Sequence, residues 1–133
     1  IRLGKMDYVV VTGWVEDIKP YIARSSVYVA PLWLGTGMRV KILEAWGMAK
    51  PVVTTSVGSQ GIECTPGEDV LIADDPREFA AQTVRLLRDK ALREKLGRNG
   101  RNRVEARYDW EIIIQQVEQM YEEALAIKFQ RGS

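Results

Sequence analysis

The stretch from residue 35 to residue 44 carries the side chains best suited to chemistry, in the pattern G-x-G-x-R-x-K-x-x-E. Gly35 and Gly37 allow a loop to take positive φ and to bring its amide N–H groups close to an anion. Arg39 and Lys41 add positive charge, and the Glu44 carboxylate can accept two hydrogen bonds from a vicinal diol such as a ribose. Together these groups indicate a site for a nucleoside diphosphate and its sugar.

Each of these features also has a purely structural interpretation. The two glycines could form turns, the two cations could be solvated, and Lys41 with Glu44 could form an i, i+3 ion pair on a helix surface. Arg39 falls in the first turn of a predicted helix, where the helix dipole disfavours a cation unless an anion lies close by. The combination of these residues between two predicted strands therefore favours a ligand site.

Two apolar strands must position this loop and the helix after it. Residues 27–30 and 51–55 predict these strands, and residues 38–48 predict a helix of about three turns between them. The helical period puts Val40, Leu43 and Gly47 on the face toward the core. A second face, which looks along the sheet edge where a ligand would lie, holds Lys41, Glu44, Ala45 and Met48.

The remaining pattern predicts an α/β fold, a partial Rossmann-like parallel sheet of about four strands flanked by helices. Residues 8–12 (Y-V-V-V-T) predict a first strand buried on both faces, and residues 69–73 predict a last, shorter strand. Asp17 can cap a helix after the first strand, and Asp75 can cap another that begins at Pro76.

The C-terminal part changes to a helical period, which predicts trailing helices. Gly97 and Gly100 are expected to loosen one of them. Asp109 can cap the last helix, whose inward face would hold Ile113, Val117, Met120, Tyr121 and Leu125. The domain would then extend over residues 1–129, and residues 130–133 would be a disordered end or a cloning remnant.

The composition excludes several kinds of chemistry. The 133 residues include one cysteine and no histidine, so an internal disulfide, a Cys-based zinc site and a Ser-His or Cys-His nucleophile are excluded. The net charge is +1, but a basic run from Arg85 to Arg107 predicts either a solvated helical face or a contact with a membrane surface or other anionic partner. We expect no nucleic-acid partner. Because no bilayer-length apolar run and no leader are visible, we expect a soluble, cytoplasmic protein.

The order of several motifs resembles the nucleotide-sugar-binding domain of the family 4 (group 1) retaining glycosyltransferases, which have the two-domain GT-B fold. The motifs are V-T-G-W-V-E-D-I at 11–18, V-Y-V-A-P-L at 27–32, G-T-G-M-R-V-K-I-L-E-A at 35–45, K-P-V-V-T-T at 50–55, G-S-Q-G-I-E at 58–63 and Y-D-W at 108–110. The resemblance covers residues 9–125 and is specific, because the motifs and their spacings match together.

The resemblance implies a parent enzyme of the hexosyltransferase class (EC 2.4). Such an enzyme moves a sugar from a nucleotide-diphosphate donor to an acceptor, here unknown, retains the anomeric configuration and needs no metal or other cofactor. Glu44 is expected to bind the nucleotide ribose. The diphosphate or sugar would face a segment that comprises Gly35, Thr36, Gly37, Met38, Arg39 and Lys41.

Three positions depart from the family pattern. The first of two glutamates usual in this region would fall at Thr36, Ala49 stands where a glycine usually ends the helix, and Gln60 stands where a glutamate is common. If residue 49 needs positive φ, alanine costs about 1 kcal/mol there. These departures favour an alternative function, a non-catalytic nucleotide-binding or interaction module with a degenerate site. A response-regulator-like switch would share the sheet layout, but Asp74 and Asp75 follow the wrong strand for its acidic cluster.

The resemblance also implies that two βα units and the acceptor-binding domain are missing before residue 8. In the usual strand order 3-2-1-4-5-6, residues 8–12 would form strand 3 without its neighbour. We expect this strand to pair with a second copy or to move beside residues 27–30, because an unpaired strand edge favours self-association. The truncated chain alone is expected to transfer no sugar, and the parent protein could contact a membrane peripherally.

Overall fold

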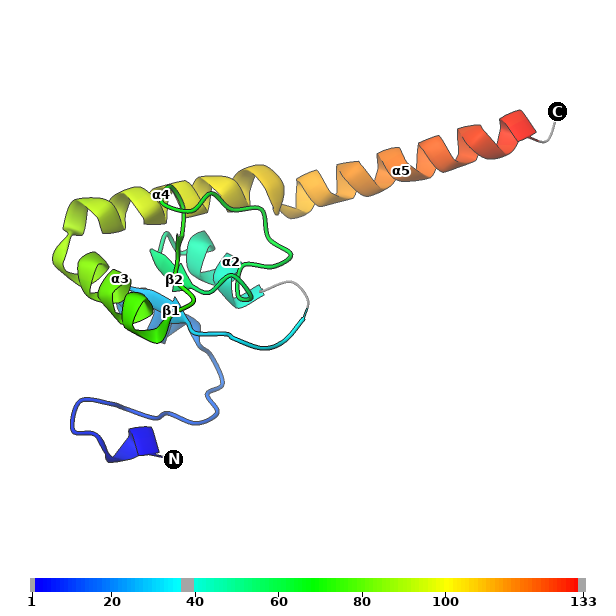
Figure 1. The fold of residues 1–133 in the computed structure, drawn as a ribbon. Coiled ribbons are helices and arrows are strands. Elements are labelled where there is room, and N and C mark those ends of the chain that lie inside the picture. Colours follow the sequence, from blue (N-terminus) through cyan, green and yellow to red (C-terminus); the bar gives the residue numbers. More distant parts are fainter. Residues whose placement is uncertain (1, 37–39, 132–133) are drawn as a thin grey trace.

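The centre of the computed structural model is a parallel sheet of three short strands (Figure 1). The structure describes residues 2–36 and 40–131. Strands β1 (Tyr28–Ala30), β2 (Val52–Thr54) and β3 (Leu71–Ile72) follow the order β1-β2-β3, and each lies within a region predicted as strand. The α/β class with a parallel sheet is therefore confirmed, although the described residues form three strands where about four were expected.

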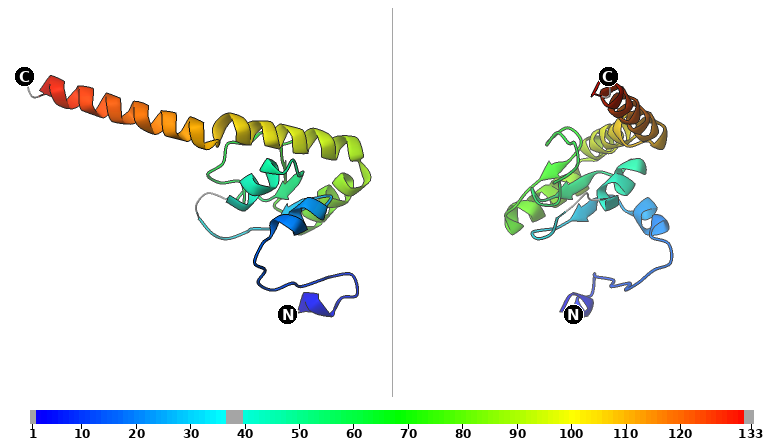
Figure 2. Two further views of the ribbon diagram at one scale, coloured as in Figure 1. Left: turned by 180° about the vertical axis from the view of Figure 1, so that it is seen from behind. Right: turned by 90° about the vertical axis from the view of Figure 1, so that its right-hand side faces the viewer.

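Helices cover both faces of the sheet (Figure 2). Helix α2 (Val40–Gly47) packs on one face and helix α3 (Pro76–Arg88) packs on the other. Because successive strand residues point to opposite faces, Val52 joins the core under α2 and Val53 joins the core under α3. The first core contains Ala30, Ile42, Ala45, Trp46, Val52, Ile62 and Val70, and the second contains Val53, Leu71, Ala73, Phe79, Leu86 and Leu96.

Helix α4 (Lys90–Arg107) packs closely against α2, and its two glycines make this contact possible. A Cβ at Gly97 would overlap the carbonyl oxygen of Ala49, and a Cβ at Gly100 would lie 2.7 Å from Cγ of Trp46. Both glycines are buried. The expectation that they loosen the helix is therefore wrong, because α4 continues through both positions and uses them for close helix packing.

Helix α3 begins where the local sequence predicts it. Asp75 is the N-cap, and its Oδ1 accepts hydrogen bonds from the backbone N–H groups of Arg77 (2.9 Å) and Glu78 (3.1 Å). Pro76 follows in the first turn, where its missing N–H has no helical partner to lose. The N-cap of α1 (Lys19–Arg24) is Ile18 and not the predicted Asp17, although Asp17 Oδ1 accepts a hydrogen bond of 2.9 Å from the N–H of Lys19.

The segment 8–12 is not a strand, which corrects the prediction of a buried first strand. It lies on an extended arm that leaves the body (Figure 1) and follows a short 3-10 helix at Arg2–Lys5. Tyr8 is 100% exposed and Val10 is 86% exposed. A β-branched run forms a strand only where another strand accepts its hydrogen bonds, and within the described residues neither β1 nor any other strand pairs with it. Pairing beside residues 27–30 is therefore not observed.

Helix α5 (Trp110–Arg131) extends away from the body, which corrects the prediction that its apolar side faces inward (Figure 2). Val117, Met120, Tyr121 and Leu125 are exposed, whereas Ile113 is half-buried near the start of the helix. The amphipathic pattern correctly predicts a helix, but such a pattern does not identify what covers the apolar side. The helix includes residues 130 and 131, and residues 132–133 lie outside the described part of the chain.

Ala49 adopts a backbone conformation that favours glycine, with φ of 54°. The replacement Ala49→Gly is expected to raise the free energy of unfolding by about 1 kcal/mol, because it removes the steric cost of a Cβ in the left-handed region. Urea titration followed by circular dichroism measures this change. The matched control is Ala80→Gly on the exposed side of α3, which should lower stability by about 0.5–1 kcal/mol. Two changes of the same sign would contradict the prediction.

Candidate functional site

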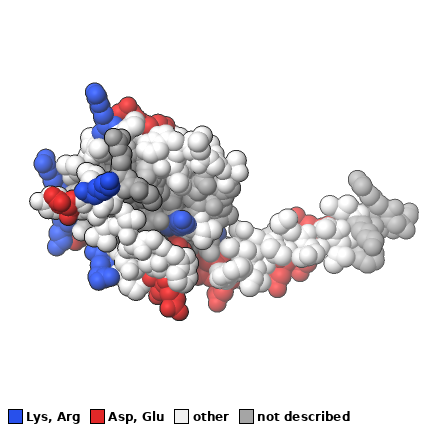
Figure 3. Space-filling view, turned by 90° about the horizontal axis from the view of Figure 1, so that it is seen from below, with Lys and Arg blue, Asp and Glu red and all other residues white. Residues whose placement is uncertain are grey.

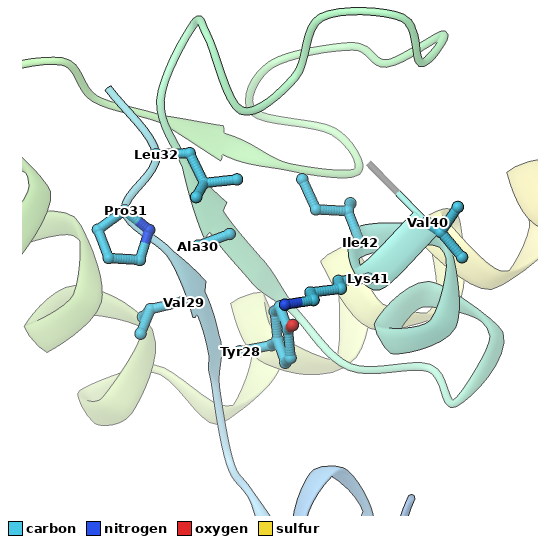
Figure 4. A pocket seen from close by; sticks show the side chains of 8 residues that line it. All are labelled: Tyr28, Val29, Ala30, Pro31, Leu32, Val40, Lys41 and Ile42. Atoms are coloured by element: carbon cyan, nitrogen blue, oxygen red, sulfur yellow. The ribbon is translucent and has the colours of Figure 1, made fainter. Parts of the chain in front are cut away.

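A cavity of about 430 Å³ lies between β1 and the first turn of α2 (Figure 4). It follows β1 to its carboxyl end, where ligands bind in open parallel sheets. Most of its described lining is apolar, and Lys41 is the charged residue among the described ones. The lining residues are Tyr28, Val29, Ala30, Pro31, Leu32, Val40, Lys41 and Ile42.

Tyr28 and Lys41 are the polar residues described in the lining of this cavity, and Glu44 lies near Tyr28. In Figure 4 the side chains of Tyr28 and Lys41 come from β1 and from α2, on the two sides of the cavity. Burial raises the pKa of the Tyr28 hydroxyl, and the negative charge of Glu44 raises it further, so the Glu44 carboxylate acts on a residue that lines the cavity. Among the described ion pairs none joins Lys41 to Glu44, so the i, i+3 ion-pair interpretation is not supported.

The faces of α2 differ in part from the prediction. Ile42, Ala45 and Trp46 form its buried side, whereas Val40 is 58% exposed and lines the cavity. The buried residues therefore lie beside the predicted core face of Val40, Leu43 and Gly47 and do not belong to it. Glu44 is exposed, as a ligand-facing residue must be, and does not enter the apolar core.

The glycine loop before α2 is described in part. Gly35 has φ of 122°, which confirms that this position needs the freedom of glycine. Thr36 is exposed and lies next to it. The predicted site residues Gly37, Met38 and Arg39 lie outside the described residues.

Threonine side chains connect the carboxyl ends of neighbouring strands beside the cavity. Thr54 Oγ1 donates a hydrogen bond of 3.0 Å to the carbonyl of Ala30, and Thr55 Oγ1 donates one to the carbonyl of Leu32. Thr55 Oγ1 also accepts a hydrogen bond of 3.0 Å from the N–H of Gly58. Because Ala30 and Leu32 line the cavity, these bonds fix one of its walls.

Sequence reasoning missed two aromatic residues here, Tyr28 and Trp33. Tyr28 lies on β1 and was assigned only to the apolar strand, although a hydroxyl-bearing side chain in a buried strand needs a polar neighbour. Trp33 lies in the loop between β1 and Gly35, and its indole N–H donates a hydrogen bond of 2.8 Å to the carbonyl of Asp74. The available signal for it was a large aromatic residue two positions before the glycine segment.

Most cations of the basic run from Arg85 to Arg107 have partners. Figure 3 shows Lys and Arg side chains projecting from the body and acidic side chains along the described part of α5. Lys90 pairs with Glu94 and Arg101 with Glu105, while the Arg93 guanidinium donates to the carbonyl of Leu86 at the end of α3. Arg103 and Arg107 pair with Glu63, and Arg103 also pairs with Asp69. These cations thus have partners within the protein, whereas the sequence predicted either a solvated face or an anionic contact.

Two further observations concern the described part of the chain. No group of three or more His, Cys, Asp or Glu side chains comes together there as a set of metal ligands. None of the described helices combines the length and the apolar character that crossing a membrane requires.

The chain was compared with protein families and with individual relatives. A family model described as "Glycosyl transferases group 1" matches residues 1–89. The capsular polysaccharide biosynthesis glycosyltransferase CapM of Staphylococcus aureus is 33% identical over 115 residues, which cover 85% of this chain and 30% of CapM. The chain therefore spans about a third of the length of this relative.

Two solved structures of glycosyltransferase-related proteins align with this chain and share its fold. The sucrose-phosphate synthase of Thermosynechococcus elongatus aligns with a TM-score of 0.71 and 31% identity, over 83% of this chain and 28% of that protein. The C-terminal domain of a group 1 glycosyl transferase (LpcC) of Francisella tularensis aligns with a TM-score of 0.66 and 21% identity, over 74% of this chain and 52% of that one. The chain belongs to the group 1 family of glycosyl transferases and has the fold of part of a GT-B C-terminal domain.

Proposed function

We propose that this chain is the donor-binding part of a retaining glycosyltransferase that takes a sugar from a nucleotide-diphosphate donor. The observation that carries the proposal is the cavity between β1 and α2, with Lys41 in its lining and Glu44 close enough to raise the pKa of Tyr28. A cation for phosphate and a carboxylate for a ribose diol thus lie beside one cavity.

In this proposal each group has one role. Glu44 accepts hydrogen bonds from the ribose hydroxyls, while Lys41 and Arg39 face the diphosphate together with amides of the loop from Gly35 to Met38. Positive charge and oriented N–H groups stabilise the diphosphate as it leaves the sugar, which is an electrostatic task that requires no metal ion. The acceptor would bind in a further part of the parent protein, as the larger size of CapM allows.

The proposal is tested by isothermal titration calorimetry of the 133-residue chain with UDP, GDP and ADP. We expect one of these nucleotides to bind and the replacement Glu44→Ala to weaken that binding by about tenfold or more, because hydrogen bonds to a charged group are lost. The control Glu118→Ala removes an exposed carboxylate from α5 and should leave affinity unchanged. Equal affinity of the wild-type chain and Glu44→Ala would reject this site.

A further prediction concerns catalysis by the chain alone. We expect no sugar transfer from UDP-glucose or GDP-mannose to water or to added saccharides, because the acceptor and the second wall of the cleft come from other parts of the parent protein. Release of free nucleotide, followed by chromatography, measures this activity. Turnover above the uncatalysed rate would show that the chain contains a complete active site.

A non-catalytic module is the second candidate, because threonine stands at residue 36, where the family resemblance implies a glutamate. In that case nucleotide binding at Glu44 would persist. The parent protein with intact acceptor-binding parts would then fail to transfer sugar from every nucleotide sugar offered.

A further inference from the structure

The loop that leads from β1 into the glycine segment is attached at its centre by Trp33. The indole Nε1 donates a hydrogen bond of 2.8 Å to the carbonyl oxygen of Asp74, which follows β3. The indole ring also contacts the ring of Phe79 on α3, with 6.0 Å between the centroids and an interplanar angle of 48°. Trp33 therefore joins a loop at one edge of the sheet to elements at the other edge.

The partner of Trp33 is itself held in place. The Asp74 carboxylate accepts a hydrogen bond of 2.8 Å from the N–H of Ser56 and one of 2.6 Å from its hydroxyl. These bonds lower the pKa of the Asp74 carboxyl, so the group is ionised at neutral pH. Ser56 follows Thr55, whose hydroxyl binds the carbonyl of Leu32, the residue before Trp33.

The bonds thus form a closed circuit across the carboxyl ends of all three strands. It runs from Trp33 to Asp74, to Ser56 and Thr55, and returns at Leu32. The indole has a single N–H donor and no acceptor, so this bond fixes the ring's direction as well as its place. Gly35, where the predicted phosphate loop begins, lies two residues after Trp33.

We propose that Trp33 is a positioning residue for the nucleotide site, which holds the start of the glycine loop in its binding geometry. This inference rests on the proposed function. A loop that is already ordered loses less conformational entropy when a ligand binds, so the anchor raises affinity without contacting the ligand. A purely core-filling role does not require the indole N–H, and Trp33 is in fact 44% exposed.

The test compares Trp33→Phe with Trp110→Phe in the 133-residue chain. The first change keeps a ring beside Phe79 but removes the N–H donor, and the second makes the same replacement at the exposed start of α5. UDP, GDP and ADP are titrated calorimetrically at a temperature at which circular dichroism shows all variants fully folded. Trp33→Phe is expected to weaken nucleotide binding by about threefold to tenfold, the range for one neutral hydrogen bond, while Trp110→Phe binds like the wild type.

A structural role for Trp33 predicts a different result. Trp33→Phe would then lower the midpoint of thermal unfolding but leave the nucleotide dissociation constant unchanged, and this outcome overturns the proposal. A second measurement does not depend on a ligand: backbone ¹⁵N relaxation at residues 34–36. Order parameters there should fall in Trp33→Phe and stay constant in Trp110→Phe.

The two measurements also separate this inference from the proposed function. If the wild-type chain binds none of the three nucleotides, the proposed donor site fails, and the relaxation data alone decide whether Trp33 orders the loop. Unchanged order parameters in Trp33→Phe would overturn the anchor in that case too. If Glu44→Ala abolishes binding while Trp33→Phe has wild-type affinity, the donor site stands and the positioning role is rejected.

Discussion

Replacing Gly97 by alanine is expected to lower the free energy of unfolding by about 3 kcal/mol, at the upper end of the usual cost of overpacking. The new Cβ would overlap the carbonyl oxygen of Ala49 and lie 2.9 Å from its carbonyl carbon. Both atoms belong to the backbone, so no side-chain rotation can relieve the clash. Helix α4 would have to move away from α2, and the shared core with Trp46 would open. Urea titration measures the loss.

The matched control is Gly47→Ala at the end of α2. No atom outside its immediate neighbourhood lies within 4 Å of a Cβ at this position. The added methyl group should therefore increase stability by about 0.5–1 kcal/mol, through the better helix propensity of alanine. If Gly97→Ala were as stable as Gly47→Ala, the close contact between α2 and α4 would be wrong.

The second large effect is expected for Arg103→Ala, which should cost about 3–5 kcal/mol. The guanidinium pairs with the Asp69 carboxylate at 2.6 Å, and that side chain is only 2% exposed. It also donates a hydrogen bond of 2.8 Å to Thr65 Oγ1. Removing the cation leaves a buried carboxylate whose remaining described bond comes from the N–H of Thr65. The segment from residue 63 to residue 69 would then be held to α4 mainly by the Asn99 side-chain bond to the carbonyl of Glu68 and by the Arg107–Glu63 pair.

An exposed ion pair on the same helix provides the control. Arg101 lies 2.8 Å from Glu105, but the two side chains are 54% and 56% exposed. Arg101→Ala should therefore change the free energy of unfolding by less than about 0.5 kcal/mol. Chemical denaturation at neutral pH compares both variants, and similar losses in the two would show that burial of Asp69 does not decide the effect.

Local signals in the sequence were sufficient for the central elements. The apolar runs at 27–30, 51–55 and 69–73 contain the three strands, and the glycine-bounded segment before residue 40 leads into α2. Asp75 and Pro76 start α3 as expected, because capping depends on residues within one helical turn. The resemblance to group 1 glycosyltransferases is confirmed by the family match over residues 1–89.

The errors arose where structure depends on distant partners. A strand at residues 8–12 needs a neighbouring strand, and the apolar side of α5 needs a covering surface, yet neither partner can be inferred from periodicity. The glycines at 97 and 100 were interpreted from helix propensity alone, whereas their role depends on Ala49 and Trp46, about fifty residues earlier.

In the candidate site, too, local features were predicted from the sequence and contacts between distant segments were not. The loop and helix that carry Lys41 and Glu44 were predicted from spacing, and the positive φ at Gly35 agrees with it. The interactions of Tyr28 with Glu44 and of Trp33 with Asp74 join separate elements of the fold, so residue spacing alone does not predict them. The role of Glu44 in ribose binding stays a prediction for the titration with nucleotides.

The glycine-mediated packing of α4 on α2 has a consequence for the position of Glu44. Trp46 lies two residues after Glu44 on the same helix, so the size of the residue at position 100 sets how closely α4 can approach the helix that carries Glu44. A larger residue there would push α2 away from α4 and displace the Glu44 carboxylate without any change among the residues that line the cavity. In a donor site of the kind proposed, such a shift would change the preferred base or sugar from a position outside the cavity.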